Sequence, residues 1–348
     1  MNLNKSKDTI LTSKQYNYGL GLLKVILAFC VIRTHNFNYN TIKNKILLYI
    51  LLYRRIHVPS FFIMSFYFSH RDLTSSNVKL FLKRIERLLI PYLIWPIILF
   101  ILNNYILNKF IILKKYSFNR LKNQFLIGTG VVDIFWFQWN LIVLTIIFVF
   151  IIRVFRKNHL FLILIFGCFS YFMQYSGYNH RLIQHLKREM ELTLGRFFIS
   201  VPFTSTGFIL GNFKILNIIA NYKIQTLILC ILIFGFLEKY HIFAPIKHNN
   251  SYNGFLFNIK SICLVFVFSL FPSNKINNIK IRKILKHISN YTEGVYYLHI
   301  HIILYFKDFI KPIKNGTLFG LFIIYLICYF ISFIGMQLFR NTKFKYLF

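Results

Sequence analysis

Long apolar runs separated by short basic stretches alternate along the whole chain. Most runs reach or approach the roughly 20 residues that a helix needs to cross a bilayer, so the pattern predicts about ten transmembrane helices. The chain should therefore be an all-α membrane protein, a polytopic helical bundle. The predicted spans are residues 17–36, 57–70, 88–107, 134–152, 159–177, 196–212, 223–238, 255–272, 291–310 and 317–338.

Two further stretches combine basic and apolar residues at helical spacing, residues 41–56 and 78–90. This pattern predicts interfacial amphipathic helices that lead into the second and third spans. No repeat, polar linker or hinge rich in Gly, Ser or Pro divides the chain. We therefore expect one integral-membrane domain over residues 1–348, with its core at 17–338 and no separate soluble domain.

The basic residues change the expected partners. Lys and Arg number 42 against nine Asp and Glu, which gives a net charge of +33. They are spread over many short loops, so anionic lipid headgroups or an anionic ligand explain them better than nucleic acid, which we do not expect as a partner. A slight excess of Lys and Arg in alternate loops favours a cytoplasmic N-terminus. We expect a multi-pass protein of the cell (inner or plasma) membrane.

Several kinds of chemistry have no support in the sequence. The five cysteines lie far apart in apolar runs, and the eleven histidines show no ligand spacing. We therefore expect no metal site and no permanently bound cofactor. The nucleophile elbow, the phosphate-binding loop, the dinucleotide fingerprint and the zinc-protease motif are absent from the sequence.

The first span carries the most unusual pattern, LLKVILAFCVIRTH at residues 22–35. Lys24 and His35 are eleven residues apart, about three helical turns or 16 Å, so they share one helix face. Arg33 is out of phase with them and close enough to the helix end to snorkel. Ionisable groups at membrane depth cost roughly 2.5–3.5 kcal/mol each, so they usually serve a purpose. Packing against buried partners and a proton or ion pathway are both compatible with this stripe.

The same stretch resembles the first span of the acyltransferase-3 family, the integral-membrane O-acyltransferases. That span carries a basic residue, ten residues and then a histidine; the basic residue is usually arginine, and here it is Lys24. Further family-like motifs follow in order over most of the chain: VPSFFIMSFYF at 58–68, FLKRIERLLIPYLIWPI at 81–97, FWFQWNLI at 135–142, RFFISVPFTSTGFILG at 196–211 and GVYYLHIHIILYF at 294–306.

The resemblance implies a catalytic role for His35. An imidazole can take the proton from a hydroxyl that attacks a thioester, or it can carry the acyl group itself, and the sequence does not choose between these. Lys24 is expected to stabilise negative charge on the thioester carbonyl or to hold the donor; an internal ion pair is the alternative.

The resemblance also implies further site residues. Lys83, Arg84 and Arg87 form a dense basic patch that could hold the phosphates of an acyl-CoA donor, or could anchor the chain on anionic headgroups. The expected site-lining residues come from two stretches of the chain, while His301 is interpreted as structural. They are His299, Tyr297, Glu293, Asp133 and Trp136, with Asp133 as a possible partner of His35.

The function implied is the transfer of an acyl group, most simply acetyl from acetyl-CoA as co-substrate, to a hydroxyl of a cell-surface polysaccharide or its lipid-linked precursor. The main alternative is a non-enzymatic exporter of acyl groups or glycan intermediates, because a charged stripe within the membrane also suits a transport path.

Overall fold

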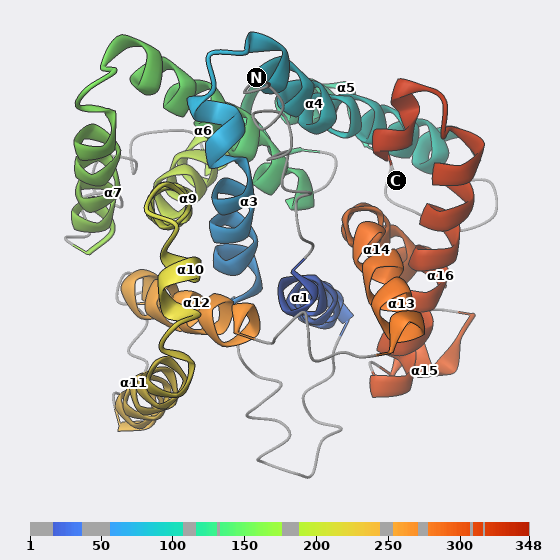
Figure 1. Cartoon of the computed structure of the whole chain (residues 1–348). Coiled ribbons are helices and arrows are strands. Elements are labelled where there is room, and N and C mark those ends of the chain that lie inside the picture. Colours follow the sequence, from blue (N-terminus) through green and yellow to red (C-terminus); the bar gives the residue numbers. More distant parts are fainter. Residues whose placement is uncertain are drawn as a thin grey trace, which may run out of the picture.

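The computed structural model describes residues 17–36, 56–106, 116–130, 133–175, 188–243, 253–270, 278–306, 309–315 and 317–347, and these ranges contain helices and connecting turns but no β-strand (Figure 1). The expected all-α class is confirmed for this part of the chain. The longer helices are α1 (Tyr18–Asn36), α3 (His57–Thr74), α4 (Val78–Ile101), α5 (Phe118–Ile127), α6 (Trp136–Val154), α7 (His159–Tyr175), α9 (Arg188–Asn212), α11 (Lys223–Phe243), α12 (Asn253–Ser269), α13 (Ile279–Asn290), α14 (Thr292–Phe306) and α16 (Leu318–Leu338). Short elements connect or end them: η2 (Leu102–Ile106), η4 (Asp133–Phe135), α10 (Ile215–Ile219), α15 (Lys311–Lys314) and η5 (Lys343–Leu347).

Each predicted span coincides with one of these helices. Among the described residues, five helices are long and apolar enough to cross a bilayer, which makes the chain a multi-pass membrane protein; they cover Tyr18–His35, Val78–Tyr105, Trp136–Val154, Leu192–Asn212 and Leu318–Leu338. The apolar helices at His159–Met173, Lys223–Leu237 and Ile259–Ser269 are shorter. Five crossings are thus supported by length and composition, and the predicted ten remain an expectation.

The basic stretch at 78–90 and the span predicted at 88–107 form one continuous element, α4 extended by η2. Asn77 starts it, because its side chain accepts a hydrogen bond from the Lys79 backbone N–H at 3.0 Å. The apolar part of this element, Val78–Tyr105, has 28 residues and is about 42 Å long, more than the roughly 30 Å of a hydrocarbon core. Its first turns therefore extend beyond the core, as the basic residues there require. The interfacial helix predicted at 41–56 lies outside the described residues except for its last position.

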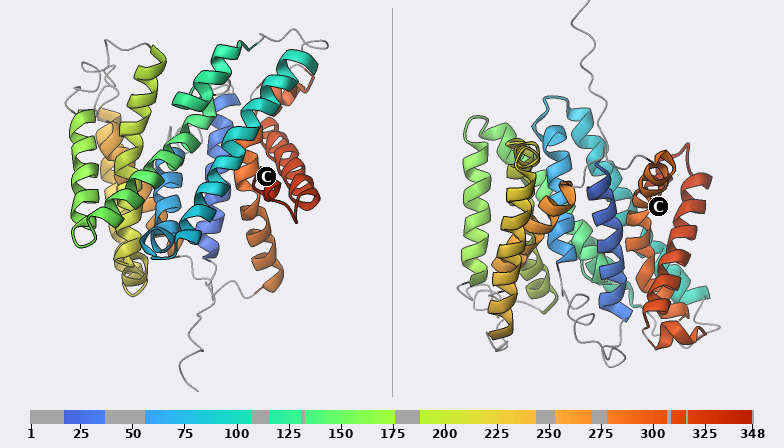
Figure 2. Two further views of the ribbon diagram at one scale, coloured as in Figure 1. Left: turned by 90° about the horizontal axis from the view of Figure 1, so that it is seen from above. Right: turned by 60° about the horizontal axis from the view of Figure 1, so that its bottom comes forward.

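Helix α1 lies between two groups of helices, α3 and α6–α12 on one side and α13–α16 on the other (Figures 1 and 2). It contributes to the hydrophobic core of both. Leu20, Leu23 and Leu27 pack with α3, α6 and α9, whereas Ala28 and Ile32 pack with α4, α14 and α16. The two hydrophobic cores thus meet along α1, and its C-terminal end contacts α14.

The most extensive helix contact is that of α3 with α9. Gly207 makes this close approach possible, because a Cβ at this position would collide with the backbone carbonyl of Ile63. Small residues at crossing points are how helices pack in membranes, where apolar burial gives little drive for association. Polar side chains add links between neighbouring helices: the Asn140 amide donates to the Ser200 hydroxyl at 2.9 Å.

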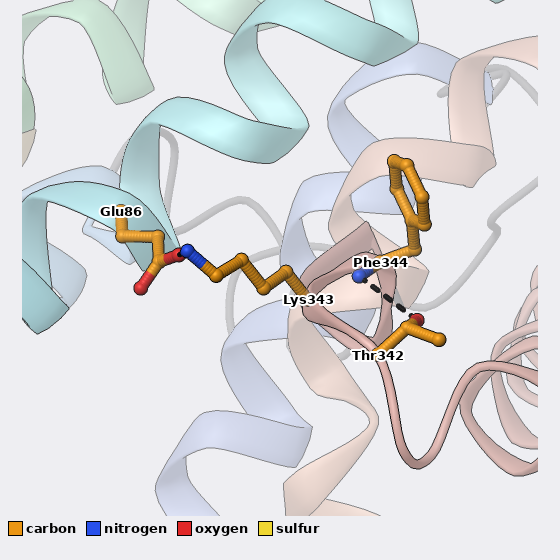
Figure 3. A network of polar contacts seen from close by, with 4 residues as sticks. All are labelled: Glu86, Thr342, Lys343 and Phe344. Carbon is orange, nitrogen blue, oxygen red and sulfur yellow. Dashed lines mark hydrogen bonds and ion pairs between the residues drawn. The ribbon is translucent and has the colours of Figure 1, made fainter.

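The C-terminal segment folds back on α4. The Trp95 indole N–H donates to the backbone carbonyl of Leu347 at 2.9 Å, and the Lys343 ammonium pairs with the Glu86 carboxylate at 2.5 Å. Figure 3 shows this pair together with the Phe344 backbone N–H, which donates to the Thr342 hydroxyl. The hydrogen bond and charge of Glu86 raise the pKa of Lys343 above its ordinary value. Element η5 therefore joins α4, at Glu86 and at Trp95, to the end of α16.

Candidate functional site

The last turn of α1 brings His35 beside His299 of α14. The centroids of the two imidazole rings lie 5.3 Å apart, and their planes are inclined by 44°. His299 is completely buried, whereas His35 is exposed. The fold thus pairs one accessible imidazole from the first motif with one enclosed imidazole from the last motif.

The hydrogen bonds of His299 fix its protonation pattern. Its Nδ1 lies 2.7 Å from the backbone carbonyl oxygen of Tyr296. A carbonyl can only accept, so Nδ1 carries the proton and, in the neutral ring, Nε2 is left as an acceptor. That Nε2 is buried and has no hydrogen-bond partner within the described ranges. Buried polar atoms are normally satisfied, so an unsatisfied acceptor beside His35 suggests a functional use.

Tyr296 forms the frame of this pair. Its hydroxyl donates to the backbone carbonyl of Ile134 at 2.9 Å. Its ring centroid lies 5.4 Å from that of Phe137 and 6.5 Å from that of Phe61. Tyr296 was not predicted as a site residue. Its spacing could have predicted it, because a residue three positions before His299 lies on the same helix face.

The two other predicted residues of α14 lie elsewhere on the helix. Tyr297 is buried, and its ring stacks on Phe135 with 6.1 Å between centroids and an angle of 13°. Glu293 is exposed in the first turn, about 9 Å along the helix axis from His299. His301 is buried like His299 but sits 6.0 Å from the ring of Tyr305. Of this set, the structure brings His299 to His35.

Trp136, at the start of α6, contacts a basic residue of α9. The Arg196 guanidinium carbon lies 5.3 Å from the centroid of the Trp136 ring, a cation–π distance. Trp136 is among the residues predicted from the sequence and Arg196 is not, although Arg196 is the first residue of the motif at 196–211. The Asp133 side chain is outside the described part of the chain, so its pairing with His35 stays a prediction. Its backbone directly precedes Ile134, the residue whose carbonyl holds Tyr296.

Lys24 lies on the opposite half of α1 from His35. Its ammonium nitrogen sits 5.8 Å from the centroid of the Phe68 ring on α3. The side chain is half-buried, and among the described residues it forms no ion pair. The structure thus gives Lys24 a cation–π contact, and both expected roles of its charge remain predictions.

The predicted basic patch is divided between the inside and the outside of the bundle. Lys83 and Arg87 are exposed, whereas Arg84 is only 4% exposed. Arg84 lies seven residues before Pro91, which places both on the buried face of α4. The patch predicted from spacing is thus two outward cations and one inward cation.

Inside the bundle Arg84 bridges three helices. Its Nε donates to the Thr145 hydroxyl and its Nη2 to the Ser65 hydroxyl, each at 3.2 Å. Its guanidinium carbon also lies 5.2 Å from the centroid of the Phe66 ring. No carboxylate in the described ranges is within 4.0 Å of it. The carboxylates of Asp72 and Glu293 lie beyond ion-pair distance but still act on its charge, so Arg84 is a buried cation held directly by hydroxyls and an aromatic face.

Helix α3 gives the spacing between these groups. Phe61 borders the histidine pair through Tyr296, Phe66 lies against Arg84, and Phe68 lies against Lys24. Five and seven residues of helix correspond to about 7.5 and 10.5 Å. Phe66 is fully buried and Phe68 is 45% exposed, so Arg84 and Lys24 lie on different sides of α3.

A known protein family accounts for nearly the whole chain. The family model for the acyltransferase-3 domain matches residues 17–340, nearly the whole chain. The chain belongs to the acyltransferase-3 family. Comparison with the curated proteins and with the solved structures gives no significant match. The histidine pair, Arg84 and Lys24 are thus features of a membrane acyltransferase.

The described residues contain no group of three His, Cys, Asp or Glu side chains with the geometry of a metal site. The expectation that the protein uses no metal and no resident cofactor stays a prediction.

Proposed function

We propose that this membrane acyltransferase is an O-acetyltransferase, which moves acetyl from acetyl-CoA to a hydroxyl of a cell-surface polysaccharide or of its lipid-linked precursor. The family assignment supports acyl transfer, and the contact of His35 with His299 is the observation that supports the position of the reacting centre. The donor, the acceptor and the location in the cell (inner or plasma) membrane with a cytoplasmic N-terminus belong to the proposal.

In this mechanism His35 acts as a general base. The acceptor hydroxyl loses its proton to His35 while its oxygen attacks the thioester carbonyl, and a carbon–oxygen bond forms. The carbon–sulfur bond then breaks, and the imidazolium returns the proton to the departing CoA thiolate. If His35 carries the acyl group instead, its ring nitrogen attacks the thioester first and the hydroxyl attacks the acyl-imidazole second.

His299 serves as a positioning residue for His35. Its Nδ1 proton is committed to Tyr296, so its Nε2 can only accept a hydrogen bond while the ring is neutral. An acceptor at this place orients the His35 ring and stabilises the imidazolium that forms, as carboxylates do in catalytic triads. A neutral acceptor suits an apolar surrounding, where a carboxylate would cost more to bury.

The cations along α3 define the proposed donor path. Lys83 and Arg87 lie exposed on α4, where the phosphates of coenzyme A would bind and where anionic headgroups would otherwise gather. Arg84 on one side of α3 and Lys24 on another are assigned, in this proposal, to the polar arm of the donor. Lys24 is about 16 Å from His35 along α1, so in this proposal it holds the polar arm of the donor rather than the thioester oxygen.

The test uses inside-out vesicles that contain the full chain, radiolabelled acetyl-CoA and the cell's own glycans. Alkali-labile label in the glycan fraction is measured for the natural protein, for His35→Ala and for His159→Ala. His159 is the control because it starts α7, a helix that carries none of the proposed site residues, and its Nδ1 contacts the Arg156 carbonyl. We expect label with the natural protein and with His159→Ala, and a loss of label with His35→Ala.

Equal label in all three proteins would remove His35 from the chemistry. A His35→Gln variant distinguishes export of acyl groups, because a transport path that needs only a polar lining should tolerate glutamine. Acyl transfer should not tolerate it, since the amide neither takes up a proton near neutral pH nor carries an acyl group.

A further inference from the structure

A cavity of about 420 Å³ lies between α13 and α16, apart from the histidine pair. Residues one turn apart on each helix form its walls, so two stripes face each other across it. The residues that the argument uses are Lys283, Ile284 and His287 of α13 and Tyr325, Leu326 and Tyr329 of α16. Its size is within the range of small-molecule sites.

The charged residues of α13 beside the cavity are all basic. Helix α13 carries Lys280, Arg282, Lys283 and Lys286 and no acidic residue. Its isoleucines are also exposed; Ile284, at the cavity, is 55% exposed and Ile279 is 66% exposed. A short helix with basic and apolar exposed residues is typical of the interface between headgroups and acyl chains.

The inner wall offers aromatic surface and one unused donor. Tyr325 is 5% exposed, and its ring stacks on Phe29 of α1 with 4.1 Å between centroids. Its hydroxyl has no hydrogen-bond partner in the part of the chain that the structure describes. The His287 ring lies 6.1 Å from that of Tyr329. A cation at the exposed side and aromatic walls within match a molecule with an anionic head and a hydrocarbon tail.

We propose that this cavity binds one anionic phospholipid of the surrounding bilayer. The phosphate lies on Lys283 and His287, and one acyl chain runs against Leu326 and Tyr329. Basic pockets beside transmembrane helices hold anionic headgroups through the same combination of charge and apolar walls. The bound lipid links α13 to α16 and, through Tyr325 and Phe29, to the helix that carries His35. This proposal does not depend on the proposed acetyl transfer.

The test counts lipids bound to the purified full chain by native mass spectrometry in detergent, with phosphatidylglycerol or zwitterionic phosphatidylcholine added. We expect one retained phosphatidylglycerol and weaker binding of phosphatidylcholine. Lys283→Gln should weaken the first about fivefold, the usual effect of one basic side chain near a lipid headgroup. Lys280→Gln is the matched control, an exposed lysine on the same helix that does not line the cavity.

Three results would overturn the proposal. Equal binding of the two lipids by the unmodified protein would exclude headgroup recognition, and this comparison needs no variant. Equal losses in Lys280→Gln and Lys283→Gln would assign binding to diffuse charge on α13. Displacement of phosphatidylglycerol by a lower concentration of a polyisoprenyl phosphate would assign the cavity to a lipid-linked sugar carrier. Leu326→Trp, which fills the cavity, should abolish retention of phosphatidylglycerol while size-exclusion elution stays normal.

Discussion

The Nδ1 proton of His299 is held by the backbone carbonyl of Tyr296, one turn earlier in α14. Tyr296 is in turn fixed by its hydroxyl, which donates to the Ile134 carbonyl in η4. Two hydrogen bonds thus link the loop before α6 to the imidazole that faces His35. Because of this link, changes at Tyr296 should act on the reaction without touching the bound donor.

Tyr296→Phe should lower kcat and leave KM for acyl-CoA unchanged. The change deletes the hydroxyl and its bond to Ile134 but keeps the ring and the backbone carbonyl that orients His299. Loss of one such hydrogen bond destabilises a protein by about 1 kcal/mol, and a less rigid His299 lowers the rate. Initial rates over a range of acetyl-CoA concentrations separate the two constants. Tyr222→Phe, at a tyrosine that is 59% exposed, is the control. A rise in KM with normal kcat would contradict this role.

Arg84→Met should raise KM for acyl-CoA without unfolding the protein. No described carboxylate is left unpaired by this change, and a buried ion replaced by an apolar side chain of similar length often leaves stability unchanged or higher. Loss of donor affinity with retained stability is the result expected of a binding residue. Titrations of acyl-CoA and thermal melting in detergent measure the two effects.

Arg153→Met provides the matched control for Arg84→Met, because Arg153 also packs on a phenylalanine ring, at 5.7 Å from the centroid of Phe81, but is exposed. It should change neither quantity. Collapse of Arg84→Met, with normal folding of the control, would make Arg84 a structural residue.

Much of this arrangement could be predicted from local pattern. Apolar runs of membrane length predicted the helices, because a helix forms all its backbone hydrogen bonds within its own segment, whatever surrounds it. His35 and His299 were both named from motifs, but their contact depends on α1 passing between two helix groups, and no periodicity encodes that path. Arg84 and Arg87 appeared as neighbours from their spacing, yet burial separated them, since the inward face of α4 is set by its partners.

The C-terminal segment offers a comparison of a buried hydrogen bond with an exposed ion pair. Trp95→Phe removes the indole bond to Leu347, whose cost should be about 1 kcal/mol of stability. Lys343→Gln removes the pair with Glu86, in which the lysine side chain is 78% exposed, and exposed pairs contribute little. We expect limited proteolysis to release the C-terminal residues faster from Trp95→Phe than from Lys343→Gln. The reverse order would show that the ion pair holds η5 on α4.

The contact of α3 with α9 allows a test with opposite signs at two glycines of one helix. Gly207→Ala places a Cβ against the Ile63 carbonyl, a backbone atom that cannot turn aside, so α3 and α9 must separate. Overpacking of this kind costs about 1–3 kcal/mol. Gly195→Ala meets nothing within 4 Å and should stabilise α9 through the better helix propensity of alanine. Thermal melting in one detergent should therefore give a lower midpoint for the first variant and an equal or higher midpoint for the second.

Because α3 carries the phenylalanines that border Lys24, Arg84 and Tyr296, Gly207→Ala should also lower acyl transfer. Equal midpoints for the two variants would mean that the close approach at Ile63 is not present in the folded protein.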